Sequence, residues 1–337
     1  MTLSKFFFAA FIFGVVSAPT AQADGDYVNH PRAKILISRL VSNHGFTRKQ
    51  VAAILDEAEQ IPELIPKETE NAEKVKPWHE YRRQFVHPLR IKSGVEFMRK
   101  YSHTLARAEK EFGVPPEVIT GIIGVETVYG KLTGNIRVLD ALATQGFEHP
   151  TRADFFLDEL EAFFVLCRQQ RWDAEDLKGS YAGAMGTAQF MPSNYLKLAL
   201  DYDHNGELDL WDPQDAIGSI ANYFAKYRGE GLGWMRGAPV AFPAHAEPAR
   251  LGLIPRNGKT TDMLFGRLWE AGLRPVGAPQ DVLQVDTPVG LIELEGREAL
   301  EYWVALNNFY VIMSYNPRAK YAMAVYQLSQ GIREAPL

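Results

Sequence analysis

The stretch Gly121-Ile-Ile-Gly-Val-Glu-Thr-Val-Tyr-Gly130 places one carboxylate, Glu126, inside an otherwise apolar run. Pro115 and Pro116 precede the run, as at a helix start, and Gly130 follows it, as at a helix end. We therefore expect a largely buried helix. A carboxyl group that loses contact with water favours its neutral form, which a general acid needs to protonate a leaving oxygen. The alternative is a buried glutamate paired with an arginine or with backbone donors, and this stretch alone leaves both open.

The first 23 residues have the pattern of an export signal. Lys5 precedes an apolar run at residues 6–16, and Ala21-Gln22-Ala23 is a small-x-small cleavage pattern. The run is too short to span a membrane, which needs about 20 apolar residues. No cysteine follows the cleavage site, so we expect no lipid anchor. The sequence predicts a soluble, exported, periplasmic protein cleaved near Ala23, without a transmembrane span.

Composition excludes several classes of function. The chain has 337 residues, with 36 Lys and Arg against 41 Asp and Glu, and no basic run stands out. Nucleic acid and anionic membranes are therefore poor partners. The single cysteine, Cys167, lies in an apolar helical pattern and is expected to be a packing residue. The histidines lack close metal-ligand spacing, and no Gly-x-Ser-x-Gly motif occurs, which disfavours a catalytic zinc site and the common serine hydrolases.

Most of the chain has helical sequence patterns. They cover residues 31–112 except for a charged loop at 61–77, and then the Glu126 segment, 152–170, 213–228 and a closing helix at 319–332. Glycine and proline rise at 229–255, which indicates a boundary. Short strands are expected at 281–286 and 289–294, and the aromatic segment 302–313 is β-prone.

Residues 179–192 are rich in side chains without bulk. Glycines at 179, 183 and 186 would let a ligand or another backbone approach closely. Ser180 and Gln189 are the hydrogen-bonding groups of this stretch. The alternative is close packing of two helices.

Asp201-Tyr-Asp-His-Asn-Gly-Glu-Leu-Asp-Leu-Trp-Asp212 matches the start of a calcium loop. Oxygen-bearing residues occupy positions 1, 3 and 5, and Gly206 occupies position 6, where the loop turns sharply. Asp212 replaces the usual glutamate at position 12 and Pro213 follows at once, so the ordinary loop fails at its end, but a longer loop closed by Asp215 is stereochemically reasonable. The expected ligands are Asp201, Asp203, Asn205, Glu207 through its carbonyl, and Asp215. The alternative is a polar turn without metal.

Aromatic and amide residues gather at Trp78-His-Glu-Tyr81, and from Asn308-Phe-Tyr310 through Tyr315-Asn316 to Tyr321. Tyrosine has a flat apolar face and a polar tip, which suits stacking on sugar rings. Core packing is the alternative for either cluster alone.

Taken together, the chain resembles the lytic murein transglycosylase B family. The resemblance rests on separated motifs in one order: Gly113-Val-Pro-Pro-Glu117, Gly124-Val-Glu-Thr127, Leu139-Asp-Ala-Leu-Ala143, Gly183-Ala-Met-Gly186 with Gln189-Phe-Met-Pro192, Leu210-Trp-Asp-Pro213 with Asp215-Ala-Ile-Gly-Ser219, and Asn308-Phe-Tyr310 through to Tyr321-Ala-Met-Ala324. It covers nearly all of the chain after the signal, with weaker matches before Trp78.

The resemblance implies an α+β, mainly α fold. A lysozyme-like helical catalytic core with the calcium loop would occupy 113–236, after an N-terminal helical domain at 24–112. A small mixed α/β domain would follow at 237–305, and the segment 306–337 would return to the groove and the helical domain.

The resemblance also implies the function and the site. The family cleaves the β-1,4 bond between N-acetylmuramic acid and N-acetylglucosamine without adding water, and leaves 1,6-anhydromuramic ends. Glu126 matches its single general acid/base. The residues that match its groove are Tyr81, Arg152, Ser180, Gln189, Tyr223, Tyr315, Asn316 and Tyr321. One departure is Thr151-Arg152, where the family can carry two arginines. The calcium ligands map onto the loop residues named above, and no organic cofactor is expected.

The partners expected are peptidoglycan glycan strands and, beyond them, other proteins of cell-wall synthesis or hydrolysis. Two other functions stay open on sequence grounds. A hydrolytic muramidase would need a second carboxylate facing Glu126, and Asp140, Glu148 and Asp154 are the nearest in sequence. A non-catalytic peptidoglycan-binding protein would keep the aromatic groove but would not need a buried acid.

Overall fold

Helices form most of the computed structural model, which describes residues 26–65, 76–226, 233–279 and 281–336. The helices are η1 Asp26–Asn29, α1 Pro31–His44, α2 Arg48–Asp56, η2 Pro62–Leu64, α3 Trp78–Phe85, α4 Pro88–Lys100, α5 Ser102–Phe112, α6 Pro116–Thr127, α7 Val138–Glu148, α8 Ala153–Gln170, α9 Pro192–Leu198, α10 Pro213–Lys226, α11 Pro248–Leu251, α12 Phe265–Glu270, α13 Asn307–Tyr315 and α14 Ala319–Glu334. The strands are β1 Ile136–Arg137, β2 Lys178–Gly179, β3 Ala241–His245, β4 Met263–Leu264, β5 Arg274–Pro275, β6 Pro288–Glu295 and β7 Leu300–Ala305.

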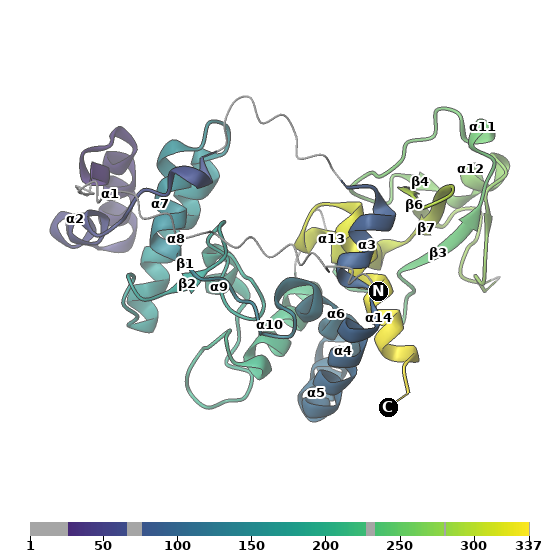
Figure 1. Cartoon of the computed structure of the whole chain (residues 1–337), viewed down its shortest axis with the longest axis horizontal. Coiled ribbons are helices and arrows are strands. Elements are labelled where there is room, and N and C mark those ends of the chain that lie inside the picture. The colour runs from purple at the N-terminus through teal and green to yellow at the C-terminus, as the bar shows by residue number, and fades with distance from the viewer. Residues whose placement is uncertain (1–25, 66–75, 227–232, 280, 337) are drawn as a thin grey trace, which may run out of the picture.

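The helices before residue 112 lie in two places. α1 packs against α2 and α8, at one end of the molecule, whereas α4 packs against α6 and α14 near its middle (Figure 1). The long α8 and α7 form the most extensive helix pair, because both carry apolar residues along their facing sides. The predicted domain boundaries at residues 112 and 236 stay predictions. The predicted signal peptide, residues 1–23, lies outside the described residues.

A five-stranded antiparallel sheet forms the other end of the molecule, in the order β4-β6-β7-β3-β5 (Figure 1). Both of its faces are covered. In β6, Val289 and Leu291 pack into a cluster with residues of α11 and α12, whereas Ile292 and Leu294 belong to the main helical core. This alternation is the period of two that a strand imposes. The sheet is therefore attached to the helical body through one face.

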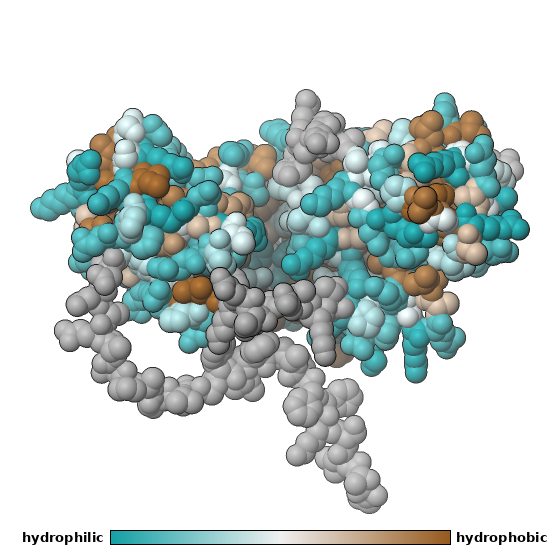
Figure 2. Space-filling view, turned by 90° about the horizontal axis from the view of Figure 1, so that it is seen from above, coloured by the Kyte–Doolittle hydropathy of each residue, from teal (hydrophilic) through white to brown (hydrophobic). Residues whose placement is uncertain are grey.

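Figure 2 shows the two ends of the molecule separated by a recess in the middle of one face. Hydrophilic residues cover most of this face, and its hydrophobic residues occur in small separate patches. Among the described residues, no helix is long and apolar enough to cross a membrane.

Several sequence predictions are confirmed. The helices at 152–170 and 319–332 correspond to α8 and α14, and the strand at 289–294 lies within β6. The helix predicted at 213–228 corresponds to α10, although its last two residues lie outside the described part. Cys167 is buried as a packing residue, and burial raises the pKa of its thiol to about 12.

Two sequence predictions are wrong. The strand expected at 281–286 is a set of turns, and the β-prone segment 302–313 is strand only as far as Ala305, after which α13 begins. In both cases tertiary packing overrides the local preference. The glycine- and proline-rich stretch 229–255 also contains β3, an inner strand of the sheet, and the boundary predicted there stays a prediction. In the loop predicted at 61–77, the described part carries η2, and residues 66–75 lie outside the description.

Candidate active site

Helix α6 carries Glu126 and is held by close contact on two sides. Pro116 occupies its first turn, as the sequence predicts, and every residue from Val118 to Val125 is buried. A side chain at Gly121 would lie 2.3 Å from the Ser329 hydroxyl of α14. A side chain at Gly124 would lie 2.7 Å from the Tyr129 hydroxyl. These two glycines therefore allow the close packing that fixes the helix in place.

The end of α6 adopts an unusual backbone conformation. The helix ends at Thr127, before the predicted cap at Gly130, and Val128, Tyr129 and Gly130 all have positive φ, at 53°, 61° and 81°. The left-handed region is costly for a branched residue such as valine. Hydrogen bonds hold the turn: Gly130 N donates to Thr127 Oγ1, and Tyr129 Oη donates to the Arg90 carbonyl. A strained turn thus follows directly after Glu126.

Thr127 joins this turn to a neighbouring loop. Its hydroxyl donates at 3.1 Å to the carbonyl of Thr187. Thr187 N in turn donates to the Leu210 carbonyl at 2.7 Å, and its hydroxyl donates to the Trp211 carbonyl at 3.2 Å. Sequence reasoning missed Thr127 and Thr187, although the position of Thr127 directly after Glu126 was a usable signal.

Glu126 is partly buried and is bonded to a tyrosine. Tyr321 Oη donates to Glu126 Oε1 at 2.5 Å. Burial raises the pKa of Glu126 to about 7, and the hydrogen bond from Tyr321 opposes the rise because it stabilises the carboxylate. Among the described residues, no arginine or lysine forms an ion pair with Glu126. The interpretation as a structural glutamate paired with an arginine therefore fails for this part of the chain.

Three tyrosines from separate helices gather around Glu126, and a fourth, Tyr223, packs against one of them. Burial, followed by the nearby charge of Glu126, raises the pKa values of Tyr315 and Tyr321. Burial also raises the pKa of Tyr81, with Glu126 adding to the rise and Arg318 opposing it. The Tyr223 and Tyr315 rings lie 4.9 Å apart. Arg318 is a charged neighbour of this group that the sequence did not single out.

Two of these tyrosine hydroxyls are bound to the backbone. Tyr315 Oη donates to the Ala188 carbonyl at 2.5 Å, and Tyr223 Oη donates to the Ser314 carbonyl at 2.9 Å. These hydrogen bonds fix the orientation of both rings. The half-exposed Tyr315 ring therefore faces the site in a single orientation.

Residues 179–192 form a tight loop after β2, so the alternative of two packed helices is wrong. Met185 bridges to both Gly179 and Phe190, and Gly183 and Gly186 have positive φ. A side chain at Gly186 would lie 2.6 Å from a backbone carbonyl. The glycines therefore allow the loop to fold this tightly.

Ser180 and Gln189 are half-exposed residues of this loop. Ser180 Oγ accepts a bond from Ala184 N at 3.1 Å. Gln189 Nε2 donates to the carbonyls of Thr133 and Gly186, at 3.0 and 2.9 Å. The carbonyl of Ala188, which receives Tyr315, joins the loop to the tyrosine group.

Arg152 and Asn316 are less closely connected to Glu126. Arg152 is exposed beside the start of α8, with its guanidinium over the rings of Phe155 and Phe156 at 4.7 and 5.1 Å. Asn316 is half-exposed and follows α13, directly after Tyr315. Among the described contacts, none joins either side chain to Glu126.

The carboxylates considered for a hydrolase are occupied elsewhere. Asp140 accepts a bond from Glu59 N at 2.9 Å and lies 3.2 Å from Arg137. Asp154 is paired with an arginine of α1, and Glu148 lies 3.8 Å from a histidine beside that helix. Among the described contacts, none brings these three groups to Glu126, so they do not supply a second carboxylate.

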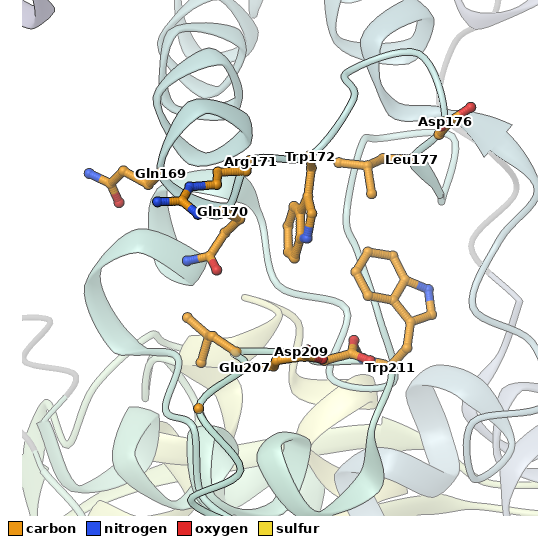
Figure 3. A pocket seen from close by; sticks show the side chains of 11 residues that line it. Gln169, Gln170, Arg171, Trp172, Asp176, Leu177, Glu207, Asp209 and Trp211 are labelled. Carbon is orange, nitrogen blue, oxygen red and sulfur yellow. Dashed lines mark hydrogen bonds between the residues drawn. The ribbon is translucent and has the colours of Figure 1, made fainter.

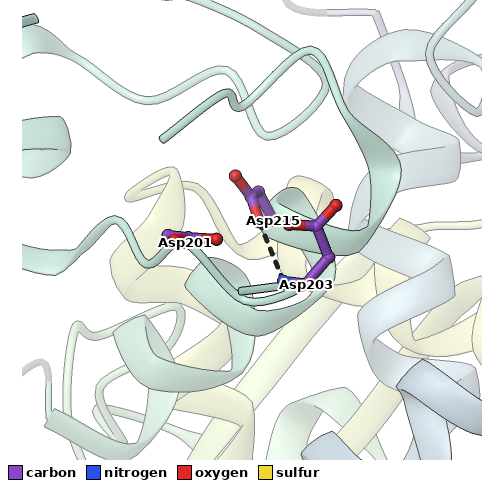
Figure 4. A group of neighbouring side chains, drawn as sticks. All are labelled: Asp201, Asp203 and Asp215. Atoms are coloured by element: carbon purple, nitrogen blue, oxygen red, sulfur yellow. Dashed lines mark hydrogen bonds between the residues drawn. The ribbon is translucent and has the colours of Figure 1, made fainter. Parts of the chain in front are cut away.

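The loop at Asp201 assembles three carboxylates at one point. One oxygen each from Asp201, Asp203 and Asp215 lie within 4.8 Å of one another (Figure 4). Asp215 is buried at the start of α10 and accepts bonds from three backbone N–H groups of the loop, those of Tyr202, Asp203 and Asp209.

Hydrogen bonds from backbone N–H groups hold the turn of this loop. Asn205 N donates to Asp201 and Asp203, and Glu207 N donates to Asn205 Oδ1 at 2.7 Å. Gly206 has a φ of 90°, as position 6 of a calcium loop requires. Hard oxygen donors in this number suit calcium.

Comparison with known proteins agrees with this architecture. The family model described as "Transglycosylase SLT domain" matches residues 30–330. The chain is 41% identical over 320 residues to membrane-bound lytic murein transglycosylase B of Escherichia coli, covering 92% of this chain and 85% of that protein.

Solved structures agree as well. The chain is similar to soluble lytic transglycosylase SltB1 from Pseudomonas aeruginosa, with a TM-score of 0.82, 42% identity and coverage of 90% of this chain and 100% of that one. It is also similar to E. coli lytic transglycosylase Slt35 in complex with calcium, with a TM-score of 0.80, 39% identity and coverage of 94% and 98%. The predicted fold, mainly helical with a lysozyme-like core and a small sheet, is confirmed. The chain belongs to the lytic murein transglycosylase B family of enzymes acting on peptidoglycan.

Proposed function

We propose that the chain cleaves the β-1,4 bond between N-acetylmuramic acid and N-acetylglucosamine without water, leaving 1,6-anhydromuramic ends. The observation that carries this proposal is a single, partly exposed carboxyl group whose pKa is raised to about 7, with no second carboxylate among the nearby candidates. Hydrolysis by the usual routes needs two carboxylates. An intramolecular attack needs one.

Glu126 takes two roles in turn. In its protonated form it donates a proton to the glycosidic oxygen, and the bond from that oxygen to C1 of the muramic residue breaks. The resulting carboxylate then accepts the proton of the 6-hydroxyl of the same residue as that oxygen bonds to C1. Tyr321 stabilises the intervening carboxylate through its hydrogen bond. The nucleophile belongs to the substrate, so proximity replaces the activation of bulk water.

The residues around Glu126 would hold the glycan. Tyr81 and Tyr315 offer half-exposed rings for the apolar faces of sugars. Ser180, Gln189 and Asn316 offer half-exposed polar groups for hydroxyl and N-acetyl groups. Tyr223 acts behind Tyr315 by supporting its ring. Arg152 would meet an acidic stem peptide at the edge of the site, with Thr151 unable to add a second charge.

Calcium would occupy the loop at Asp201. Its ligands would be Asp201, Asp203, Asn205, the Glu207 carbonyl and Asp215. The convergence of three carboxylates supports this, since none of them forms an ion pair with a cation in the described part of the chain. One solved relative is described as a complex with calcium. The ion would neutralise these charges and tie the loop to α10, and it takes no part in the bond cleavage proposed above.

Export to the periplasm is part of the same proposal, because the charged start, apolar run and Ala21-Gln22-Ala23 pattern predict a signal peptide. Peptidoglycan strands would be the partner there.

Digestion of purified peptidoglycan followed by mass analysis tests the proposal. We expect muropeptides lighter by one water than the products of a hydrolysing muramidase. Products with reducing ends would show that the protein hydrolyses the bond and is not a transglycosylase. If a correctly folded sample produces no new ends, the protein only binds peptidoglycan. The Glu126→Gln variant is the matched control and should release neither product.

A further inference from the structure

A cavity of about 620 Å³ lies outside the Glu126 site, between the end of α8 and the loop that leads to α10. Its wall comes from two segments, residues 169–177 and 206–211. In Figure 3 the Trp172 and Trp211 side chains lie near one another in this space, and Gln170 points into it from the end of α8. Ligand pockets of proteins have about this volume. Among the described contacts, none joins a residue of this wall directly to Glu126 or its tyrosines.

The two indoles form the apolar part of the cavity. Trp172 and Trp211 lie 6.1 Å apart between ring centroids at 81°, and both are partly exposed. Tyr195 packs behind Trp172 at 5.6 Å. The backbone N–H of Trp211 is held by Asp209 Oδ1 at 2.8 Å. The indoles are therefore supported from behind and keep surface free for a ligand.

The charges around the indoles restrict the kind of ligand. Asp176, Glu207 and Asp209 line the cavity against one cation, Arg171. This excess of acid disfavours phosphate and polyanions. Gln169 and Gln170 add amide groups, which both donate and accept hydrogen bonds. Indole faces beside amides and carboxylates suit a neutral sugar that carries hydroxyl and N-acetyl groups.

Arg171 occupies a position where glycine would be easier to accommodate. It caps α8 with a φ of 58°, in the left-handed region that glycine adopts without strain. Its side chain is exposed and stands at the cavity. Strain of this kind points to a use for the side chain that the helix end itself does not require.

We infer that the cavity between Trp172 and Trp211 is a second saccharide-binding site, which holds an N-acetylated β-1,4-linked glycan away from the catalytic carboxyl. This inference rests on the proposed substrate, because a long glycan strand, or a neighbouring one, can reach a second site on the same enzyme. A second contact raises the effective concentration of the strand at the first.

The experiment follows indole N–H signals by NMR while chitotetraose, a tetramer of N-acetylglucosamine, is added to the Glu126→Gln protein. The variant removes turnover, so the result does not depend on the proposed chemistry. The six tryptophans give separate probes, each assigned by a Trp→Phe variant. The Trp172 and Trp211 signals should shift with added sugar. Trp269, an exposed tryptophan on α12, is the internal control and should not shift.

Two variants test the site further by binding to insoluble peptidoglycan. Trp172→Ala should weaken binding by about 3- to 10-fold, and Trp172→Phe should restore much of it. Arg171→Gly should also weaken binding while it raises the melting temperature, since it relieves the backbone strain. The expected loss of binding without loss of stability separates a ligand contact from a structural role.

Either of two results would overturn the inference. In one, chitotetraose shifts only Trp78, which stacks on Tyr81 beside the catalytic carboxyl, so that sugar binds at the Glu126 site alone. In the other, Arg171→Gly and Trp172→Ala bind peptidoglycan as the parent does. Both results would leave the proposed cleavage chemistry intact, because that is tested by the ends produced.

Discussion

Glu126→Gln should make the protein more stable above pH 7 while it removes activity. Burial raises the pKa of Glu126 from 4.5 to about 7. Below pH 4.5 the carboxyl is neutral in both the folded and the unfolded chain, and it costs little. Between pH 4.5 and 7 the unfolded chain releases its proton more readily, so wild-type stability falls as pH rises. The span of about 2.5 pH units corresponds to about 3 kcal/mol, and a glutamine avoids this loss.

The assay is denaturant unfolding of both proteins at pH 4, 5, 6, 7 and 8. The two free energies of unfolding should agree at pH 4 and diverge by about 3 kcal/mol at pH 8, with Glu126→Gln the more stable. Glu117→Gln is the matched control on the same helix. It removes a carboxylate from the first turn, where negative charge is favourable, so it should not stabilise the protein at pH 8.

The same variant should also lose its activity on peptidoglycan. Cleavage should fall at least about 100-fold in Glu126→Gln, because the amide has no transferable proton. Equal pH profiles of stability for the variant and the parent would refute the elevated pKa. Substantial cleavage by the variant would refute the assignment of the acid.

Two further predictions concern the surroundings of Glu126, and a third concerns the loop at Asp201. Tyr321→Phe removes the donor to the carboxylate of Glu126, so the alkaline limb of the rate profile should move up by about 1–2 pH units; an unmoved limb would contradict this. Tyr315→Ala should lower turnover more than Tyr315→Phe, measured by initial rates, and the reverse order would return the ring to a packing role. Calcium at about 10 mM should stabilise a metal-free sample by about 1–3 kcal/mol, taking the affinity range of extracellular sites, and Asp203→Ala should abolish the gain seen by thermal unfolding.

The sequence predicted the elements whose local pattern agrees with their burial. In α6, the prolines at the start and the unbroken apolar run lead to a buried helix, and the structure shows one. In β6, alternation predicted a strand, and its two sets of side chains pack on opposite faces of the sheet. These patterns are local consequences of period and capping, so no long-range information was needed.

The sequence could not predict elements that depend on distant neighbours. α13 is rich in residues that favour strands, yet Phe309, Val311 and Ile312 are buried in the helical core, and that packing decides their conformation. The stretch expected at 281–286 alternates in polarity but pairs with no strand among the described residues. β3 contains Pro243, which argues against an inner strand, but the pairing of its neighbours with β7 outweighs this.

The sequence itself singled out Glu126, but the tyrosines around it were assigned to the site only through the resemblance to a family. Tyr81, Tyr315 and Tyr321 lie on three different elements, far from Glu126 along the chain, and no spacing rule brings them together. The convergence on Glu126 is a tertiary result. The end of α6 also depends on tertiary contacts. The sequence pointed to Gly130 as the cap, but the hydrogen bonds made by Thr127 fix an earlier end, with Val128 in the left-handed conformation.

These bonds also connect the proposed calcium loop to the residue next to Glu126. Asp215 holds the loop backbone at Asp209, and the following residues, Leu210 and Trp211, accept both hydrogen bonds from Thr187. Thr187 in turn receives the hydroxyl of Thr127, the residue next to Glu126. Catalysis of this kind depends on positions held to within a fraction of an ångström. If the loop binds calcium as we propose, loosening it at its carboxylates should therefore displace the Glu126 carboxyl, even though the ion would take no part in the proposed cleavage.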